Sequence, residues 1–266
     1  MNIALATLFL LILLYPGFIF RRFYYTEEFS REYFKQTITD LLVAAILPSA
    51  LLHIVGYYFF VRHHYIIDIA TIGTLLSGTS DGTKVTAAFQ SIYAQATGIV
   101  SYFIAVSFLA AAAGLLTKYI VRKLKLDRKF KLFRFQNEWH YIFSGEILDF
   151  PRVPGDASDI SIRYIDVLVK SDQGTIIYTG ILADYVLSKD GGIDRIYLTD
   201  VKRRYLRDDK LNQPQENTGN DERYYYLPGQ FFIIPYTQII NLHITYYKIE
   251  VTDDELTEEL DNINTD

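Results

Sequence analysis

Three long apolar runs in the first half of this 266-residue chain constrain its fold more than any other feature. They occupy residues 3–20, 38–61 and 92–116. A helix advances about 1.5 Å per residue, so about 20 apolar residues suffice to cross the hydrocarbon core of a bilayer. The sequence therefore predicts an integral membrane protein with three spans inside a transmembrane region of residues 1–118.

The first run contains Pro16 and Gly17, which should loosen the end of a helix. No basic residue precedes this run, and no A-x-A pattern follows its apolar core. Both features differ from those of a cleaved signal peptide. We therefore expect a retained, kinked helix.

Lysine and arginine flank the three runs unevenly, and this pattern predicts the orientation of the chain. They cluster in two regions: Arg21, Arg22, Arg31 and Lys35 after the first run, and Lys118, Arg122, Lys123, Lys125, Arg128, Lys129, Lys131 and Arg134 after the third. The connection between the second and third runs has only Arg62 and Lys84. Short loops rich in Lys and Arg stay on the cytoplasmic side. We expect a cell-membrane protein with its N-terminus outside and its C-terminal domain in the cytoplasm.

Residues 119–136 combine basic and apolar positions, as expected of a juxtamembrane helix that continues from the third span. Anionic lipid headgroups attract such cations. The predicted headgroup contacts are Arg122, Lys123, Lys125, Arg128, Lys129 and Lys131. A nucleic-acid-binding arm is the alternative, but the formal net charge of −5 gives no general field to hold a polyanion, so nucleic acid is not an expected partner.

Both connections between the runs are partly apolar. Aromatic residues recur through 21–37, which predicts a helix that lies either in the membrane interface or against the soluble domain. Residues 66–76 are too few to span a bilayer, and a Gly-rich turn at 78–82 follows them. We expect an interfacial or a re-entrant helix there.

Two features inside the spans are functional candidates. His53 lies midway along the second run, where an ionisable side chain is costly. It is either a proton or ligand site, or it forms hydrogen bonds with a neighbouring helix. The small residues of 110–114 permit close helix approach, either within one chain or in an oligomer or pore.

From residue 137 the periodicity changes to that of a β domain over 137–251. The predicted strands are 139–143, 161–170, 175–182, 193–201, 231–234 and 239–251, with a turn at 171–174, a long loop at 207–223 and a one-turn break at 235–238. Residues 252–266 predict a disordered acidic tail. The fold class is α+β: three transmembrane helices followed by a small antiparallel domain.

The short strand, one-turn break and final strand, after a bent hairpin with Gly174 and Gly180, resemble an SH3-like or Sm-like β barrel. The Sm family has an Arg-Gly pair near this point for RNA, whereas this chain has Asn241 and Leu242. The resemblance therefore implies a barrel without that RNA site. With its early Pro-Gly-Phe at 16–18, the whole chain is similar to an uncharacterised family of prokaryotic membrane proteins, which implies no activity.

Motifs of enzymes are missing from the sequence: there is no P-loop, no dinucleotide-binding glycine pattern, no H-E-x-x-H and no G-x-S-x-G. There are no cysteines. Acidic residues such as Asp166 fall near strand ends, where solvated turn acids are common. We expect no catalysis, cofactor or metal. Lys202, Arg203 and Arg204 form either a partner-binding site or a solvated or membrane-facing charge cluster.

These observations favour a membrane-anchored interaction or sensor protein that presents its β domain to a protein partner. The alternative is an oligomeric channel. Three spans, small residues at 110–114 and a following β domain resemble the mechanosensitive channels of small conductance in architecture. That resemblance implies a homo-oligomer.

Overall fold

The structure is a computed structural model that describes residues 3–30, 37–61, 69–135, 137–158, 160–188, 192–209 and 223–248. The chain divides into two compact units, Met1–Asp127 and Arg128–Asp266. The acidic tail predicted at 252–266 lies outside the described residues.

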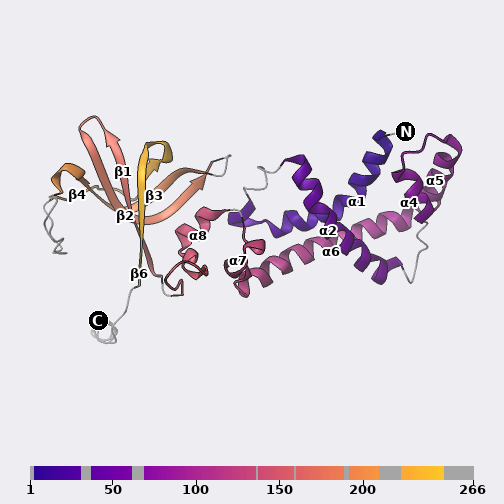
Figure 1. Cartoon of the computed structure of the whole chain (residues 1–266), viewed down its shortest axis with the longest axis horizontal. Coiled ribbons are helices and arrows are strands. Elements are labelled where there is room, and N and C mark those ends of the chain that lie inside the picture. The colour runs from indigo at the N-terminus through magenta and orange to yellow at the C-terminus, as the bar shows by residue number, and fades with distance from the viewer. Residues whose placement is uncertain are drawn as a thin grey trace, which may run out of the picture. The chain divides into compact units, whose positions relative to one another are not determined.

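Three helices of the first unit are long and apolar enough to cross a membrane (Figure 1). They are α1 (Ile3–Tyr24), α2 (Ile38–Gly56), which continues as the π-helical η2 (Tyr57–Val61), and α6 (Ala96–Lys123). The predicted number of helices long and apolar enough to span a membrane is confirmed. Thr37 begins α2 with a capping box, because its hydroxyl accepts from the Asp40 N–H at 3.2 Å and the Asp40 carboxylate accepts from the Thr37 N–H at 3.3 Å.

The third span begins and ends later than predicted. Residues 92–94 belong to a separate helix, α5 (Gly82–Ala94), and α6 starts only at Ala96. At its other end α6 includes Lys118, Arg122 and Lys123. Long basic side chains can keep their charges at the membrane surface while their stems stay apolar, so these residues do not end the helix.

The short apolar segment before α5 is helical, as predicted. It forms α4 (Ile69–Leu76), and the chain then turns at Gly78, whose φ is 60°. Asp81 begins α5 by accepting from the backbone N–H of Thr83 at 3.1 Å. The hydrogen bond from the Thr83 hydroxyl holds the pKa of Asp81 below its ordinary value. Whether α4 enters the bilayer stays a prediction.

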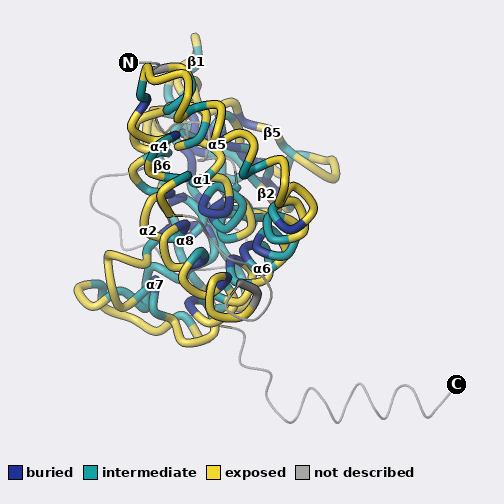
Figure 2. The backbone as a smooth tube through the Cα atoms, turned by 90° about the vertical axis from the view of Figure 1, so that its right-hand side faces the viewer, coloured by how far each residue is buried: buried dark blue, intermediate teal, exposed yellow. Residues whose placement is uncertain are grey.

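The small residues of α6 pack within the chain. Ala110 is fully buried in a cluster with Leu52 of α2, and Ile19 and Phe20 of α1 pack against that cluster. A Cβ atom on Gly114 would lie 2.5 Å from the Phe20 carbonyl oxygen. Buried, intermediate and exposed residues alternate along α6, because only one side of this helix packs against the rest of the chain (Figure 2).

The connection after α1 is only partly helical in the described residues. Residues 27–30 form one 3-10 turn, and residues 31–36 lie outside the description. Phe29 of this turn is 1% exposed, with the Lys118 and Arg122 cations 5.7 and 5.4 Å from its ring centroid. The turn therefore packs on the end of α6. The Lys118 ammonium also lies 2.6 Å from the Glu27 carboxylate, and this hydrogen bond lowers the pKa of Glu27.

The basic segment predicted as one helix is broken into pieces. After α6, Lys125 takes a φ of 53°, and short helices α7 (Leu126–Lys129) and η3 (Lys131–Phe133) follow. A positive φ is unfavourable for a residue with a side chain. The buried Asp127 carboxylate lies 2.7 Å from the Arg122 guanidinium, an ion pair that accompanies this turn.

The strand predicted at 139–143 is wrong: these residues belong to helix α8 (Glu138–Ser144). The Asn137 side chain accepts from the His140 N–H at 3.2 Å, and Gly145 ends the helix with a φ of 83°. An Asn cap and a left-handed glycine are the usual boundary signals of a helix. A single 3-10 turn, η4 (Glu146–Asp149), follows.

The second unit is built on an antiparallel sheet. Its strands are β1 (Ile162–Ser171), β2 (Gly174–Leu187), β3 (Ile193–Tyr205), β4 (Tyr225–Tyr226), β5 (Phe232–Pro235) and β6 (Ile239–Tyr247). The 3-10 turns η5 (Leu206–Asp208) and η6 (Tyr236–Gln238) follow β3 and β5. The predicted hairpin, the one-turn break and the final strand are confirmed. β4 was not predicted.

The sheet is open, and the closed barrel is not confirmed. Its order is β4-β3-β2-β1-β6, with β5 also paired to β3. β5 and β6 therefore lie at opposite edges although only η6 separates them in the chain. Among the described strands no ladder joins β5 to β6, so η6 is a covalent connection between the two edges without strand pairing.

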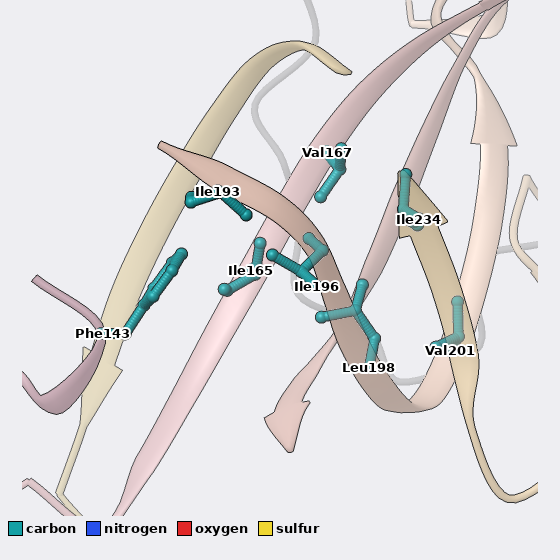
Figure 3. Packing of buried hydrophobic residues seen from close by; sticks show 8 residues of the cluster. All are labelled: Phe143, Ile165, Val167, Ile193, Ile196, Leu198, Val201 and Ile234. Carbon is teal, nitrogen blue, oxygen red and sulfur yellow. The ribbon is translucent and has the colours of Figure 1, made fainter. Parts of the chain in front are cut away.

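The core of this unit lies between α8 and the sheet (Figure 3). It consists of Phe143 from α8, Ile165 and Val167 from β1, Ile193, Ile196, Leu198 and Val201 from β3, and Ile234 from β5. Gly180 lets β2 approach β3 closely, because a Cβ atom there would lie 2.9 Å from the Thr199 carbonyl oxygen. The β2–β3 register shifts beside it.

Candidate functional sites

His53, predicted to lie within a span, belongs to a polar cluster that joins the three long apolar helices. Pro16 has no N–H to offer the preceding turn of α1. The next N–H, that of Gly17, donates to the Ser49 hydroxyl of α2 at 2.8 Å. That hydroxyl donates in turn to the Leu14 carbonyl at 2.9 Å. The Ser49 side chain of α2 thus satisfies backbone groups on either side of Pro16 in α1, as lipid cannot.

His53 lies one helical turn after Ser49 and continues this pattern. Its Nε2 is 2.9 Å from the Leu13 carbonyl oxygen, and its Nδ1 is 2.7 Å from the Tyr102 hydroxyl of α6. A carbonyl only accepts, so Nε2 carries the proton and, in the neutral ring, Nδ1 accepts from Tyr102. The Tyr102 ring stacks on the imidazole and Phe103 meets it edge-on.

The described contacts of His53 are therefore with uncharged groups. Each ring nitrogen has a partner, and each partner comes from a different helix. This arrangement matches the hydrogen-bonding alternative for His53 better than an open ligand site. Sequence analysis identified His53 but missed Ser49 and Tyr102, which the i, i+4 spacing and the aromatic polarity of the spans could have indicated.

We expect His53→Leu to lower the free energy of unfolding of the first unit by about 1–3 kcal/mol, since intramembrane hydrogen bonds contribute about 0.6–2 kcal/mol each. Titration of the purified protein in mixed micelles with SDS, followed by far-UV circular dichroism, measures the change. Ile54→Leu is the matched control, because Ile54 is on the same helix and 65% exposed. Equal stability of the two variants would rule out a clamping role for His53.

The predicted lipid contacts divide into two groups. Lys123, Lys125, Lys129 and Lys131 are exposed. Arg122 pairs with Asp127, and Arg128 is 12% exposed and pairs with Glu146 and Asp149. The Arg128–Glu146 distance is 2.7 Å. The two arginines thus have carboxylate partners inside the protein, and the headgroup prediction is best placed on the four lysines.

The predicted residues Lys202, Arg203 and Arg204 lie on β3, opposite a strand that the sequence analysis missed. Lys202 pairs with Tyr226 and Arg203 with Tyr225 in the β3–β4 ladder. The Lys202 ammonium lies 4.4 Å from the Tyr224 ring centroid, and the Arg203 guanidinium lies 5.2 Å from that of Tyr225. We call Lys202, Arg203 and Tyr224, Tyr225 and Tyr226 the cation–tyrosine patch.

Arg204 differs from the other two cations. Its side chain is 11% exposed and pairs with Asp209, which also accepts from Arg223 at 3.2 Å. Among the residues that the structure describes, neither Lys202 nor Arg203 forms an ion pair. Their cations are held over aromatic faces, as is that of Arg204, 5.2 Å from the Tyr224 ring centroid. Such a contact contributes about 0.5–1 kcal/mol at an exposed site.

Strand alternation puts Lys202 and its ladder partner Tyr226 on one face of the sheet and Arg203 and Tyr225 on the other. The patch therefore wraps the β4 edge of the sheet and offers one oriented positive charge beside an exposed phenol ring on each face.

A groove lies between α8 and the end of the sheet. This groove has a volume of about 420 Å³. Its lining residues are Trp139, Ile142, Tyr236, Ile239, Ile240, Asn241, Leu242 and Ile244. The Tyr246 hydroxyl donates to the carbonyl of the lining residue Ile142 at 2.5 Å, and burial raises the pKa of this phenol. The groove combines apolar side chains with the polar groups of Tyr236 and Asn241, and none of its lining side chains is a carboxylate, histidine or lysine that could perform acid–base chemistry near neutral pH.

One acid from the sequence analysis has a titratable neighbour. Asp166 of β1 accepts from the Thr179 hydroxyl at 2.5 Å and lies 3.3 Å from Nδ1 of His243. His243 is 71% exposed, so this pair is solvated. Within the described part of the chain, no three His, Asp or Glu side chains gather as metal ligands.

Comparison with known proteins adds no relative: no family model, curated protein or solved structure matches the chain.

Proposed function

We propose that this chain is a membrane-anchored interaction protein whose β unit binds an acidic segment of a protein partner at the cation–tyrosine patch. The observation that carries the proposal is the pairing of Lys202 and Arg203 with three consecutive tyrosines. Tyr225 and Tyr226 are 58% and 66% exposed. Tyr and Arg are enriched at the energetic centres of protein interfaces, and oriented cations select acidic partners.

The distribution of Lys and Arg supports a cytoplasmic position for the β unit. The exposed lysines at 123, 125, 129 and 131 lie among exposed apolar side chains, and we assign them to an anionic lipid surface. The consecutive β5, η6 and β6 at opposite sheet edges support an SH3-like relationship with an incompletely closed sheet. A relationship to the prokaryotic Pro-Gly-Phe family stays a prediction and implies no activity.

The oligomeric channel is the weaker proposal. It depended on the small residues of 110–114, and α1 covers Ala110 and Gly114 within the same chain. Close packing inside one chain explains these residues without a ring of subunits. No described contact favours a pore over an anchor.

Site-specific photocrosslinking in intact membranes tests the interaction. We expect a photoreactive residue at Tyr226 to give a discrete protein adduct, whereas one at Arg195, near the other end of β3, gives none. Charge reversal by K202E/R203E should reduce the adduct about tenfold or more, because like charges at an interface cost several kcal/mol. Equal labelling from both positions, or an adduct yield that K202E/R203E leaves unchanged, would contradict the proposal.

A further inference from the structure

The segment that follows β6 has the opposite charge to the patch. Its acidic residues are Glu250, Asp253, Asp254, Glu255, Glu258, Glu259, Asp261 and Asp266, and it contains no Lys or Arg. We propose that this acidic segment, residues 250–266, occupies the cation–tyrosine patch of its own chain and competes there with the partner. The proposal rests on the proposed function, because it assigns a competitor to the same site.

The local charges favour such an occupant. The basic residues of the patch region are Lys202, Arg203, Arg204, Arg207 and Arg223, and the described acids among them are Asp200, Asp208 and Asp209. Asp208 and Asp209 already pair with Arg207, Arg204 and Arg223. The positive charges without a described carboxylate partner are those of Lys202 and Arg203. An acidic chain that lies along the β4 edge of the sheet would pair with both cations, one on each face, while its apolar positions contact the exposed tyrosines.

The chain is long enough to reach the patch. Register places His243, Asp166, Thr179 and Lys202 side by side across β6, β1, β2 and β3. Three strand spacings of about 4.8 Å therefore separate Lys202 from β6, and Tyr247 lies about 13 Å further along that strand. The direct distance from Tyr247 to Lys202 across the sheet is therefore about 20 Å. The residues after Lys248 can extend about 60 Å at about 3.3 Å each, so most of the segment remains for contact.

Tethering makes weak contacts sufficient. Exposed ion pairs contribute about 0.2–1 kcal/mol each, so several of them give only a weak complex between separate molecules. A short tether supplies a millimolar effective concentration, which populates such a complex within one chain. Salt would weaken it, because the Debye length falls to about 3 Å at 1 M. A partner with better contacts could still displace the segment, as expected of a competitor.

Hydrogen–deuterium exchange of the full chain in lipid nanodiscs tests the proposal at residues 224–227. We expect a chain that ends at Lys248 to exchange about 3- to 10-fold faster there than the full chain. K202E/R203E in the full chain should accelerate exchange similarly. A synthetic peptide of residues 249–266, added to the shortened chain, should restore protection at low salt. The same peptide with Asn and Gln in place of its acids should not.

The acids of the neighbouring loop are the competing occupants. Asp221 and Glu222 directly precede Arg223 in the sequence. If D221N/E222Q accelerates exchange and the shortened chain does not, the loop covers the patch and our proposal is wrong. Unchanged exchange in every variant also overturns it. Neither outcome affects the photocrosslinking result, which judges partner binding separately. A larger adduct yield from the shortened chain would support both proposals.

Discussion

Gly17→Val should lower the free energy of unfolding of the transmembrane unit by about 3 kcal/mol, which is the largest single effect we expect in that unit. A Cβ atom at this position would lie 2.3 Å from the Ala45 carbonyl oxygen and 2.5 Å from the Ser49 hydroxyl. Both atoms belong to α2, so α1 would have to move away. Overpacking alone costs about 1–3 kcal/mol, and the bonds made by Ser49 would weaken as well.

Gly73→Val is the matched control, because Gly73 is also a helical glycine and has no atom within 4 Å of its would-be Cβ. Comparing the two separates the steric effect from the intrinsic helix preference of valine. SDS titration of both variants, followed by far-UV circular dichroism, measures the difference. Ser49→Ala should lose about 1 kcal/mol, since it removes the hydroxyl and adds no bulk. If both valine variants unfold together, close approach at Gly17 does not stabilise the unit.

The length of the apolar runs was sufficient to predict the three long apolar helices of the first unit, whereas the orientation inferred from charge stays a prediction. Apolar runs report length directly, because lipid demands about 20 continuous apolar residues. The boundary errors have a physical cause. Lys118 and Arg122 can remain helical with their charges at the surface, so composition ended the third span too early. Residues 92–94 are equally apolar but belong to α5, since only backbone geometry at Gln95 separates the two helices.

Local periodicity predicted some elements of the β unit correctly and others wrongly. The hairpin and the final strands follow alternation and turn residues, and these were predicted correctly. Residues 139–143 are continuously aromatic or apolar, a run that suits either a short strand or a buried helix. Asn137 and Gly145 carried the deciding signal for a helix. β4 is only two residues long and depends on its ladder with β3, so no local pattern could have indicated it.

For the candidate sites too, the sequence indicated single residues but not their partners in the fold. A lone intramembrane histidine was recognisable from sequence, but its partners lie on other helices and depend on tertiary packing. The basic run 202–204 was also recognisable. Its members differ because β-strand alternation places Lys202 and Arg203 on opposite faces, and because Asp209 pairs with Arg204. Assigning a role to each cation required the register.

Arg128→Met should destabilise the β unit by about 3–5 kcal/mol, the largest effect that we expect there. The Arg128 guanidinium pairs with both Glu146 and Asp149, and the three side chains are only 12%, 15% and 13% exposed. Removing the cation leaves two poorly solvated carboxylates without their charge partner, which is the costly way to break a buried ion pair. Trp139 is the only tryptophan and lies in α8, so its fluorescence during urea unfolding of the full chain reports on this unit.

A triple variant tests whether the two unpaired carboxylates cause this loss of stability. R128M/E146Q/D149N replaces the charges with neutral groups and should recover at least half of the stability, because burial of neutral amides costs less than burial of unpaired ions. Arg195→Met is the exposed control: its pair with Asp194 is 49% and 42% exposed and should contribute less than about 1 kcal/mol. If Arg128 and Arg195 variants lose equal stability, or if the triple variant recovers none, the buried pairing does not hold this unit together. A large loss confined to Arg128, with recovery in the triple variant, would establish that this arginine is a structural residue of the β unit.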